Sequence, residues 1–216
     1  MTQDNDLQNP ADIPKNVDEY IAKYRAAVAS NPDCGNSHYN LAVGLLGQRK
    51  FGEAEQEFHK AIDCSPTLAE AYVQLGGIAL QRGDLDTCLD FNKRATQCRA
   101  GFAEGFGNIG FVHIQRGDAE EAIRALKKAI QYNPRFVQAF ATLANAYLMS
   151  GLVDESIEAN KKAVELQPDF AVAHNNLAIA YLERGDADLA VEHLDQARSL
   201  GYAVAPEIER EIQALR

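Results

Sequence analysis

Apolar residues recur along most of the chain at the three- and four-residue spacing of amphipathic helices. The apolar segments come in pairs that are separated by short turns. Four of these turns contain a glycine: Gly83, Gly117, Gly151 and Gly185. Glycine is favoured at the end of a helix because it adopts a positive φ without steric cost. The pattern therefore predicts a series of helical hairpins.

The hairpins repeat with a period of 34 residues, since Pro32, Pro66, Pro134 and Pro168 are separated by 34, 68 and 34 positions. One alanine column follows the same period without exception: Ala27, Ala61, Ala95, Ala129, Ala163 and Ala197. A constant period of this kind indicates stacked units that share one core. We expect a mobile polar tail over 1–15 and then a single solenoid over 16–216, composed of a half repeat over 16–34, full repeats over 35–68, 69–102, 103–136, 137–170 and 171–204, and a capping helix over 205–216.

Small residues stand where the two helices of each hairpin are expected to cross. The eighth positions of the full repeats are Ala42, Gly76, Gly110, Ala144 and Ala178. Arg49 takes the place of the turn glycine in the first full repeat, so we expect a strained backbone there. After the later turns, side chains that can cap the second helices are expected at Asp84, Asp118 and Asp186.

Two segments carry a family resemblance: Ala-Glu-Ala-Tyr-Val-Gln-Leu-Gly over 69–76 and Asn-Asn-Leu-Ala-Ile-Ala-Tyr over 175–181. Together with the alanine and proline columns, they resemble the tetratricopeptide repeat family, whose unit is a helix-turn-helix of the same length. The resemblance implies an all-α fold, a right-handed superhelical solenoid of about 12 antiparallel helices. It also implies that the first helix of each repeat lines a concave surface.

Composition narrows the classes of partner. The chain has 46% apolar residues, which can form a substantial core, and a net charge of -10, which disfavours nucleic acid and anionic membrane surfaces. Residues 137–216 are the more acidic part, so the expected partner is a neutral or basic protein or peptide. Neither a membrane-spanning stretch nor a signal peptide is apparent, and we expect a cytoplasmic protein without membrane insertion.

Catalytic chemistry has no support in the sequence. The five histidines fall at four repeat positions, and no two of them have the close helical spacing of a metal face. For His38 and His174, which stand in an otherwise aromatic column, we expect a packing role. The four cysteines are too few for a disulfide framework; Cys64 and Cys98 share one column, and we expect inert core thiols, with a redox pair as the alternative. We expect no enzyme activity, no cofactor and no metal.

The concave columns contain amides and few charges. The sixth position of the repeats reads Asn40, Gln74, Asn108, Thr142 and Asn176, which resembles the asparagine ladder of the O-GlcNAc transferase superhelix. Primary amides can pair with the backbone of an extended peptide. The absence of Lys and Arg from these columns argues against the carboxylate clamp of chaperone adaptors. The other predicted groove residues are Tyr39, Gly77, Gly107, Phe111, Asn145 and Asn175.

Two local features of the surface add hypotheses. Gly77, Gly107 and Gly110 lack side chains, so they are expected to leave a pocket for a bulky apolar side chain beside Phe111. A basic cluster on the second helix of the third repeat is interpreted as a solvated face, with a docking patch as the alternative; its members are Arg124, Lys127, Lys128 and Arg135.

These observations predict a non-catalytic adaptor that binds an extended peptide or partner protein in its concave groove. Two alternatives stay open. The chain can be a scaffold that assembles with its own copies, or an accessory subunit of an enzyme complex.

Overall fold

The computed structural model describes residues 16–214, and in this range the chain forms twelve α-helices and no strand. The tail predicted over 1–15 and the last two residues of the predicted capping helix lie outside the described residues. The chain divides into two compact units, Met1–Cys98 and Arg99–Arg216, each of which is described by itself. The expectation of one solenoid over 16–216 stays a prediction.

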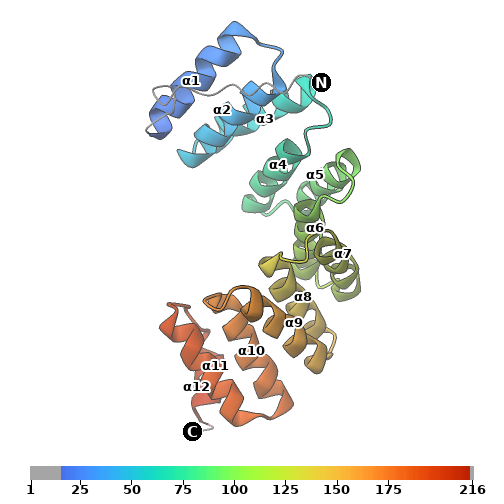
Figure 1. Cartoon of the computed structure of the whole chain (residues 1–216), viewed down its shortest axis with the longest axis vertical. Coiled ribbons are helices and arrows are strands. Elements are labelled where there is room, and N and C mark those ends of the chain that lie inside the picture. Colours follow the sequence, from blue (N-terminus) through green and yellow to red (C-terminus); the bar gives the residue numbers. More distant parts are fainter. Residues whose placement is uncertain (1–15, 215–216) are drawn as a thin grey trace. The chain divides into compact units, whose positions relative to one another are not determined.

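The first unit contains a single helix followed by two hairpins (Figure 1). Helix α1 packs on α2, and the hairpins pair α2 with α3 and α4 with α5. The helices are α1 (Val17–Ser30), α2 (Gly35–Gly47), α3 (Phe51–Cys64), α4 (Ala69–Gln81) and α5 (Leu85–Cys98). The predicted half repeat and first two full repeats are thus present as helical elements.

The second unit contains three hairpins and a final short helix (Figure 1). Its helices are α6 (Ala103–Arg116), α7 (Ala119–Tyr132), α8 (Val137–Met149), α9 (Val153–Leu166), α10 (Ala171–Arg184), α11 (Ala187–Ser199) and α12 (Pro206–Gln213). The segment predicted as a cap contains α12, which buries Ile212 completely against the last hairpin. Proline at its first position suits a helix start because no backbone N–H is needed there.

The turns between paired helices have the backbone conformation predicted from the glycines. Gly83, Gly117, Gly151 and Gly185 have φ between 72° and 86°. Arg49, at the corresponding place, has φ 59° and is the one non-glycine residue with positive φ in the described chain. The predicted strain at Arg49 is therefore confirmed, because this region is unfavourable for a residue with a Cβ.

The predicted aspartate caps are only partly correct. Asp84 accepts a hydrogen bond from the backbone N–H of Thr87 at 3.0 Å, and hydrogen bonds with the side chain and then the backbone of Thr87 lower the pKa of its carboxyl. Asp118 and Asp186 make no capping hydrogen bond. Asp118 lies 3.2 Å from Nδ1 of His113, and Asp186 pairs with a neighbouring arginine. A nearby side-chain donor has replaced the helix N-terminus as the partner of these two carboxylates.

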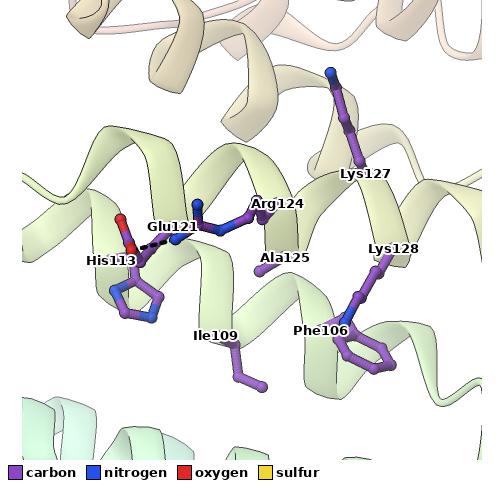
Figure 2. A pocket seen from close by; sticks show the side chains of 8 residues that line it. All are labelled: Phe106, Ile109, His113, Glu121, Arg124, Ala125, Lys127 and Lys128. Carbon is purple, nitrogen blue, oxygen red and sulfur yellow. Dashed lines mark hydrogen bonds and ion pairs between the residues drawn. The ribbon is translucent and has the colours of Figure 1, made fainter.

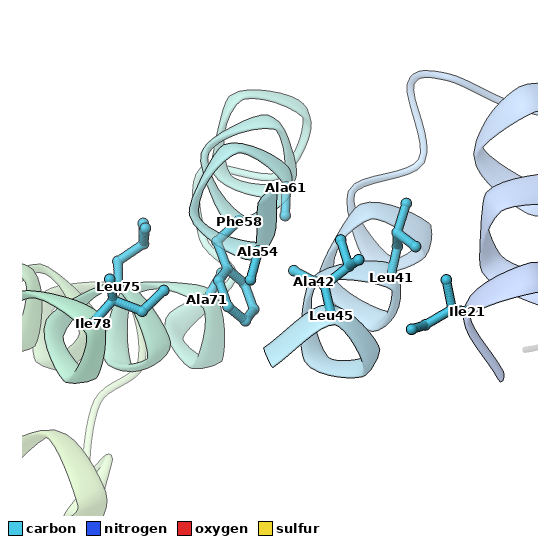
Figure 3. Packing of buried hydrophobic residues seen from close by; sticks show 10 residues of the cluster. All are labelled: Ile21, Leu41, Ala42, Leu45, Ala54, Phe58, Ala61, Ala71, Leu75 and Ile78. Carbon is cyan, nitrogen blue, oxygen red and sulfur yellow. The ribbon is translucent and has the colours of Figure 1, made fainter. Parts of the chain in front are cut away.

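The hairpins close on small residues, as predicted. In the first unit, Ala42 and Ala54 face each other from α2 and α3, both fully buried, and Phe58 fills the space beside them (Figure 3). The same arrangement recurs in the second unit, where Ala122 and Leu126 of α7 are fully buried. Close approach of the helices is thus built into every repeat by residues with little or no side chain.

Candidate peptide-binding groove

The second unit has a pocket on the surface formed by the first helices of its repeats. The pocket has a volume of about 410 Å³. Helices α6, α8 and α10 supply most of its lining, and two residues come from the segments before α10 and after α11. The lining residues are Phe111, Ile114, Gln115, Gln138, Ala141, Thr142, Asn145, Phe170, Val172, Asn176 and Tyr202. The structure therefore brings together four predicted site residues: Phe111, Thr142, Asn145 and Asn176.

A second pocket, of about 300 Å³, occupies the corresponding surface of the first unit. It is lined by Leu46, Phe51, Gln74, Gly77, Ile78 and Gln81. Gln74 and Gly77 are predicted site residues. A Cβ added at Gly77 would meet nothing within 4 Å, so this glycine does leave open space, as expected.

The space expected at Gly107 and Gly110 is filled. A Cβ at Gly107 would lie 2.9 Å from the ring of Phe136, and one at Gly110 would collide with the side chain of Leu126. Gly107 therefore accommodates the residue that precedes α8, and Gly110 allows α6 and α7 to approach. The pocket predicted from these two glycines is wrong. Phe111, which is 39% exposed, lines the pocket of the second unit instead.

Several predicted amides already have partners or are buried. Asn40 accepts a hydrogen bond from the hydroxyl of Tyr20 at 3.3 Å, and Asn176 donates to the backbone carbonyl of Ala141 at 3.4 Å. Asn175 is only 8% exposed, so its expected place in the groove is wrong. Asn175 shares a face of α10 with Ala178, three positions further on, which is completely buried.

The remaining predicted residues differ in their availability. Asn145 is exposed, whereas Gln74, Asn108 and Tyr39 are half-buried. The ring of Tyr39 lies 5.7 Å from that of Phe58, and burial raises the pKa of its hydroxyl. Tyr39 thus belongs partly to the core of the first unit. Some amides of the row are therefore exposed and available to a ligand, whereas others are partly buried or already have a hydrogen-bond partner within the chain.

The structure adds groove residues that the repeat columns did not indicate. Phe170 and Tyr202 contribute aromatic surface to one pocket, and Phe51 contributes to the other. Phe170 belongs to a recurring apolar column at the end of each repeat, just before the next helix: Leu68, Phe102, Phe136, Phe170 and Val204. That column was the available signal. Tyr202 stands in the proline column, and its position in the pocket could not be read from the spacing.

None of the residues that line the two pockets is charged. Their surfaces combine aliphatic or aromatic carbon with the amide groups of Asn and Gln. Such a surface can bury an apolar side chain while amide donors and acceptors pair with a peptide backbone. It offers no cation to a terminal carboxylate.

Histidine contacts were missed by the sequence reading. His38, expected to pack, is buried and lies 2.5 Å from Glu57 through Nδ1 and 2.8 Å from the carbonyl of Pro32 through Nε2. His174 is also buried, and its Nδ1 lies 3.0 Å from Nδ1 of His193. Burial, and secondarily the facing imidazole, lower the pKa of His193. These residues meet because they lie on the two helices of one hairpin, far apart in sequence.

The thiols and metal-binding groups complete the inventory. Cys64 is exposed, so the expectation of a core thiol is wrong there; Cys98 is half-buried. Each approaches the carbonyl of the proline 32 residues before it, at 3.8 Å and 3.3 Å respectively, so the two repeats place these thiols in the same way. Within residues 16–214, no group of three or more His, Cys, Asp or Glu side chains is arranged to hold a metal ion.

Stacked hairpins with uncharged, side-chain-sized pockets define a helical-repeat interaction module. Family models described as tetratricopeptide repeat match residues 21–69, 113–169 and 159–192. The chain belongs to the tetratricopeptide repeat family, and the resemblance noted in the sequence is confirmed. The fold is that of a protein–protein interaction module. In the described part of the chain, helices long and apolar enough to cross a membrane are not found.

Several known proteins are similar to the chain in sequence or in fold. Human mitochondrial import receptor subunit TOM70 is 32% identical over 84 residues, which is 38% of this chain but only 13% of that receptor's length. The structure of YrrB, described as a TPR protein with an unusual peptide-binding site, has a TM-score of 0.68 at 20% identity and covers 88% of this chain and 96% of its own. Pseudomonas aeruginosa PilF has a TM-score of 0.80 at 17% identity, with 93% and 90% covered. The solved structures support the fold alone.

Proposed function

We propose that this chain is a non-catalytic adaptor whose pockets bind an extended, largely uncharged segment of a partner protein. The observation that carries the proposal is the pocket of about 410 Å³ in the second unit, which joins apolar and amide groups without a charge. Phe111 and Val172 are 39% and 36% exposed at its edge, so apolar surface is available to a ligand.

Binding combines two kinds of contact. A bulky apolar side chain of the partner is buried against Phe111, Ile114 and Phe170, where the hydrophobic effect stabilises the complex. The amides of Gln138 and Asn145 meet the partner's backbone, which makes recognition tolerant of the flanking side chains. The negative net charge of the chain further favours neutral or basic flanks over acidic ones.

The test is a peptide selection on the whole chain. Random peptides displayed on phage are selected on the wild-type protein alone, and the Val172→Glu, Asn145→Lys double variant, which places charges in the pocket, is used only in the comparison of affinities. Recovered peptides are labelled, and their dissociation constants are measured by fluorescence anisotropy. We expect a large apolar residue with uncharged neighbours, and a loss of affinity of at least about tenfold on the double variant.

Lys162→Gln serves as the matched control, because Lys162 pairs with Glu165 on α9 and is not part of the pocket. This variant is expected to bind the recovered peptides like the wild type. Equal affinity for the wild type and the charged double variant would show that the pocket is not the binding site.

A further inference from the structure

A third pocket lies on a different face of the second unit, between α6 and α7 (Figure 2). Its volume is about 440 Å³. The lining residues are Phe106, Ile109, His113, Glu121, Arg124, Ala125, Lys127 and Lys128. Helix α6 presents residues 106, 109 and 113 here and residues 111, 114 and 115 to the groove pocket. The helical period separates these two sets, so the two sites are independent.

The pocket lies beside Ala125, a short side chain on α7. The same repeat position carries a larger side chain in three other repeats. In the first and fifth repeats, Glu57 and His193 reach the opposing histidine at 2.5 Å and 3.0 Å. In the second repeat, Phe91 packs on an aromatic ring with centroids 6.4 Å apart. The corresponding residue of the third repeat is Ala125, which leaves an unfilled space between itself, Ile109 and the edge of Phe106, whose ring stacks on that of Tyr132 with centroids 5.6 Å apart.

The fourth repeat also has an alanine in this column, Ala159. The charges on the surface of α9 around it differ from those on α7. There, Lys161 and Lys162 of α9 pair with Glu158 and Glu165 at 3.1 Å and 2.6 Å. The repeat-related lysines of α7 are Lys127 and Lys128.

In α7, the two neutralising glutamates of α9 are replaced by Arg124 and Gln131. Arg124 pairs with Glu121 (Figure 2). The ammonium groups of Lys128 and Lys127 instead lie over aromatic rings, 5.5 Å from the ring centroid of Phe106 and 5.7 Å from that of Tyr147. The result is an apolar floor with an excess of positive charge beside it.

We propose that this pocket binds an acidic segment of a partner protein that carries one bulky apolar side chain. The apolar side chain packs between Phe106, Ile109 and Ala125. Carboxylates on either side of this apolar side chain contact Lys127 and Lys128. These two lysines lack the glutamate partners that Lys161 and Lys162 have on α9. Because the chain as a whole has a net charge of -10, an acidic segment is repelled elsewhere and is directed to this patch.

The test uses a fluorescein-labelled peptide, Gly-Glu-Asp-Phe-Asp-Glu-Gly, and the full chain. Two matched peptides replace Phe by Ser, or every acidic residue by Lys. Ala125→Phe fills the pocket with the residue that the second repeat has at this place, and Lys127→Gln with Lys128→Gln removes the two charges. We expect each change in the protein or the peptide to weaken binding by at least about tenfold, and salt to weaken the wild-type complex.

The control is Lys161→Gln with Lys162→Gln, the same substitution on α9, which is expected to leave the affinity unchanged. Circular dichroism establishes that each variant is folded, and the lysine variants keep the test decisive if Ala125→Phe is not. Three results would overturn the proposal: no saturable binding of the acidic peptide to the wild type, equal loss from both lysine pairs, or equal affinity for the Phe and Ser peptides.

Discussion

Replacement of Asn160 by leucine is expected to stabilise the second unit. Asn160 is completely buried in α9, and in the described structure neither its Nδ2 nor its Oδ1 has a hydrogen-bond partner. The same repeat position is filled by large apolar residues in other hairpins, namely Phe58, Leu126 and Leu194, each fully buried. The site therefore has the surroundings of an apolar core residue.

The size of the effect follows from two contributions. An unsatisfied buried polar group costs about 1–3 kcal/mol, and leucine removes this cost while adding apolar burial. Imperfect fit of the branched side chain offsets part of the gain, typically by about 1–3 kcal/mol. We expect the free energy of unfolding to rise by about 1–3 kcal/mol.

Urea unfolding followed by circular dichroism measures the change, and an unchanged dependence on urea concentration shows that the same surface is exposed. Asn92→Leu is the matched control, since Asn92 is equally buried but its Nδ2 donates to the carbonyl of Cys88 at 2.8 Å. Its gain is expected to be smaller. If Asn160→Leu lowered stability, or if Asn92→Leu gained more, the assignment of an unsatisfied amide would be refuted.

Three further predictions concern the turns, the crossings and the histidine pair. Arg49→Gly relieves the positive φ and is expected to raise the free energy of urea unfolding by about 0.5–1 kcal/mol. Gly110→Ala is expected to lower it by about 1–3 kcal/mol in the same assay because a Cβ there collides with α7, whereas Gly77→Ala, in open space, is expected to be neutral or mildly stabilising. Burial and the facing imidazole of His174 lower the pKa of His193, so the folded state binds this proton less readily than the unfolded state. The free energy of unfolding should therefore decrease as the pH is lowered below about 6.5. The decrease should be less steep in His193→Phe, which lacks the titrating group.

Much of the backbone could be predicted from the sequence, because helix period and turn chemistry are local properties. The strain at Arg49 follows from one missing glycine in a column of glycines. The capping helix follows from its apolar spacing and Pro206. These features depend on residues that are close in sequence, so the repeat register suffices to place them.

Side-chain partners were less predictable because they join different helices. Gly107 looked like open groove, yet Phe136 of the following segment fills it. Asn175 and Asn176 are adjacent in sequence, but α10 buries the first and leaves the second at the edge of a pocket. Such outcomes depend on the rotation of each helix and on the length of the side chain opposite it, which a column of residue types does not specify.

The repeat itself supplies the comparison that separates structural from functional positions. One column that holds the hairpins together does not vary between repeats and is completely buried in each of them: Ala61, Ala95, Ala129, Ala163 and Ala197. Where two repeats have the same backbone environment at a position but carry side chains of different charge, packing does not explain the difference in charge. Glu158 of α9 and Arg124 of α7 are such a case: they occupy the same repeat position, carry opposite charges, and are both exposed. The differences between repeats on these exposed faces are therefore where recognition of distinct partners is expected.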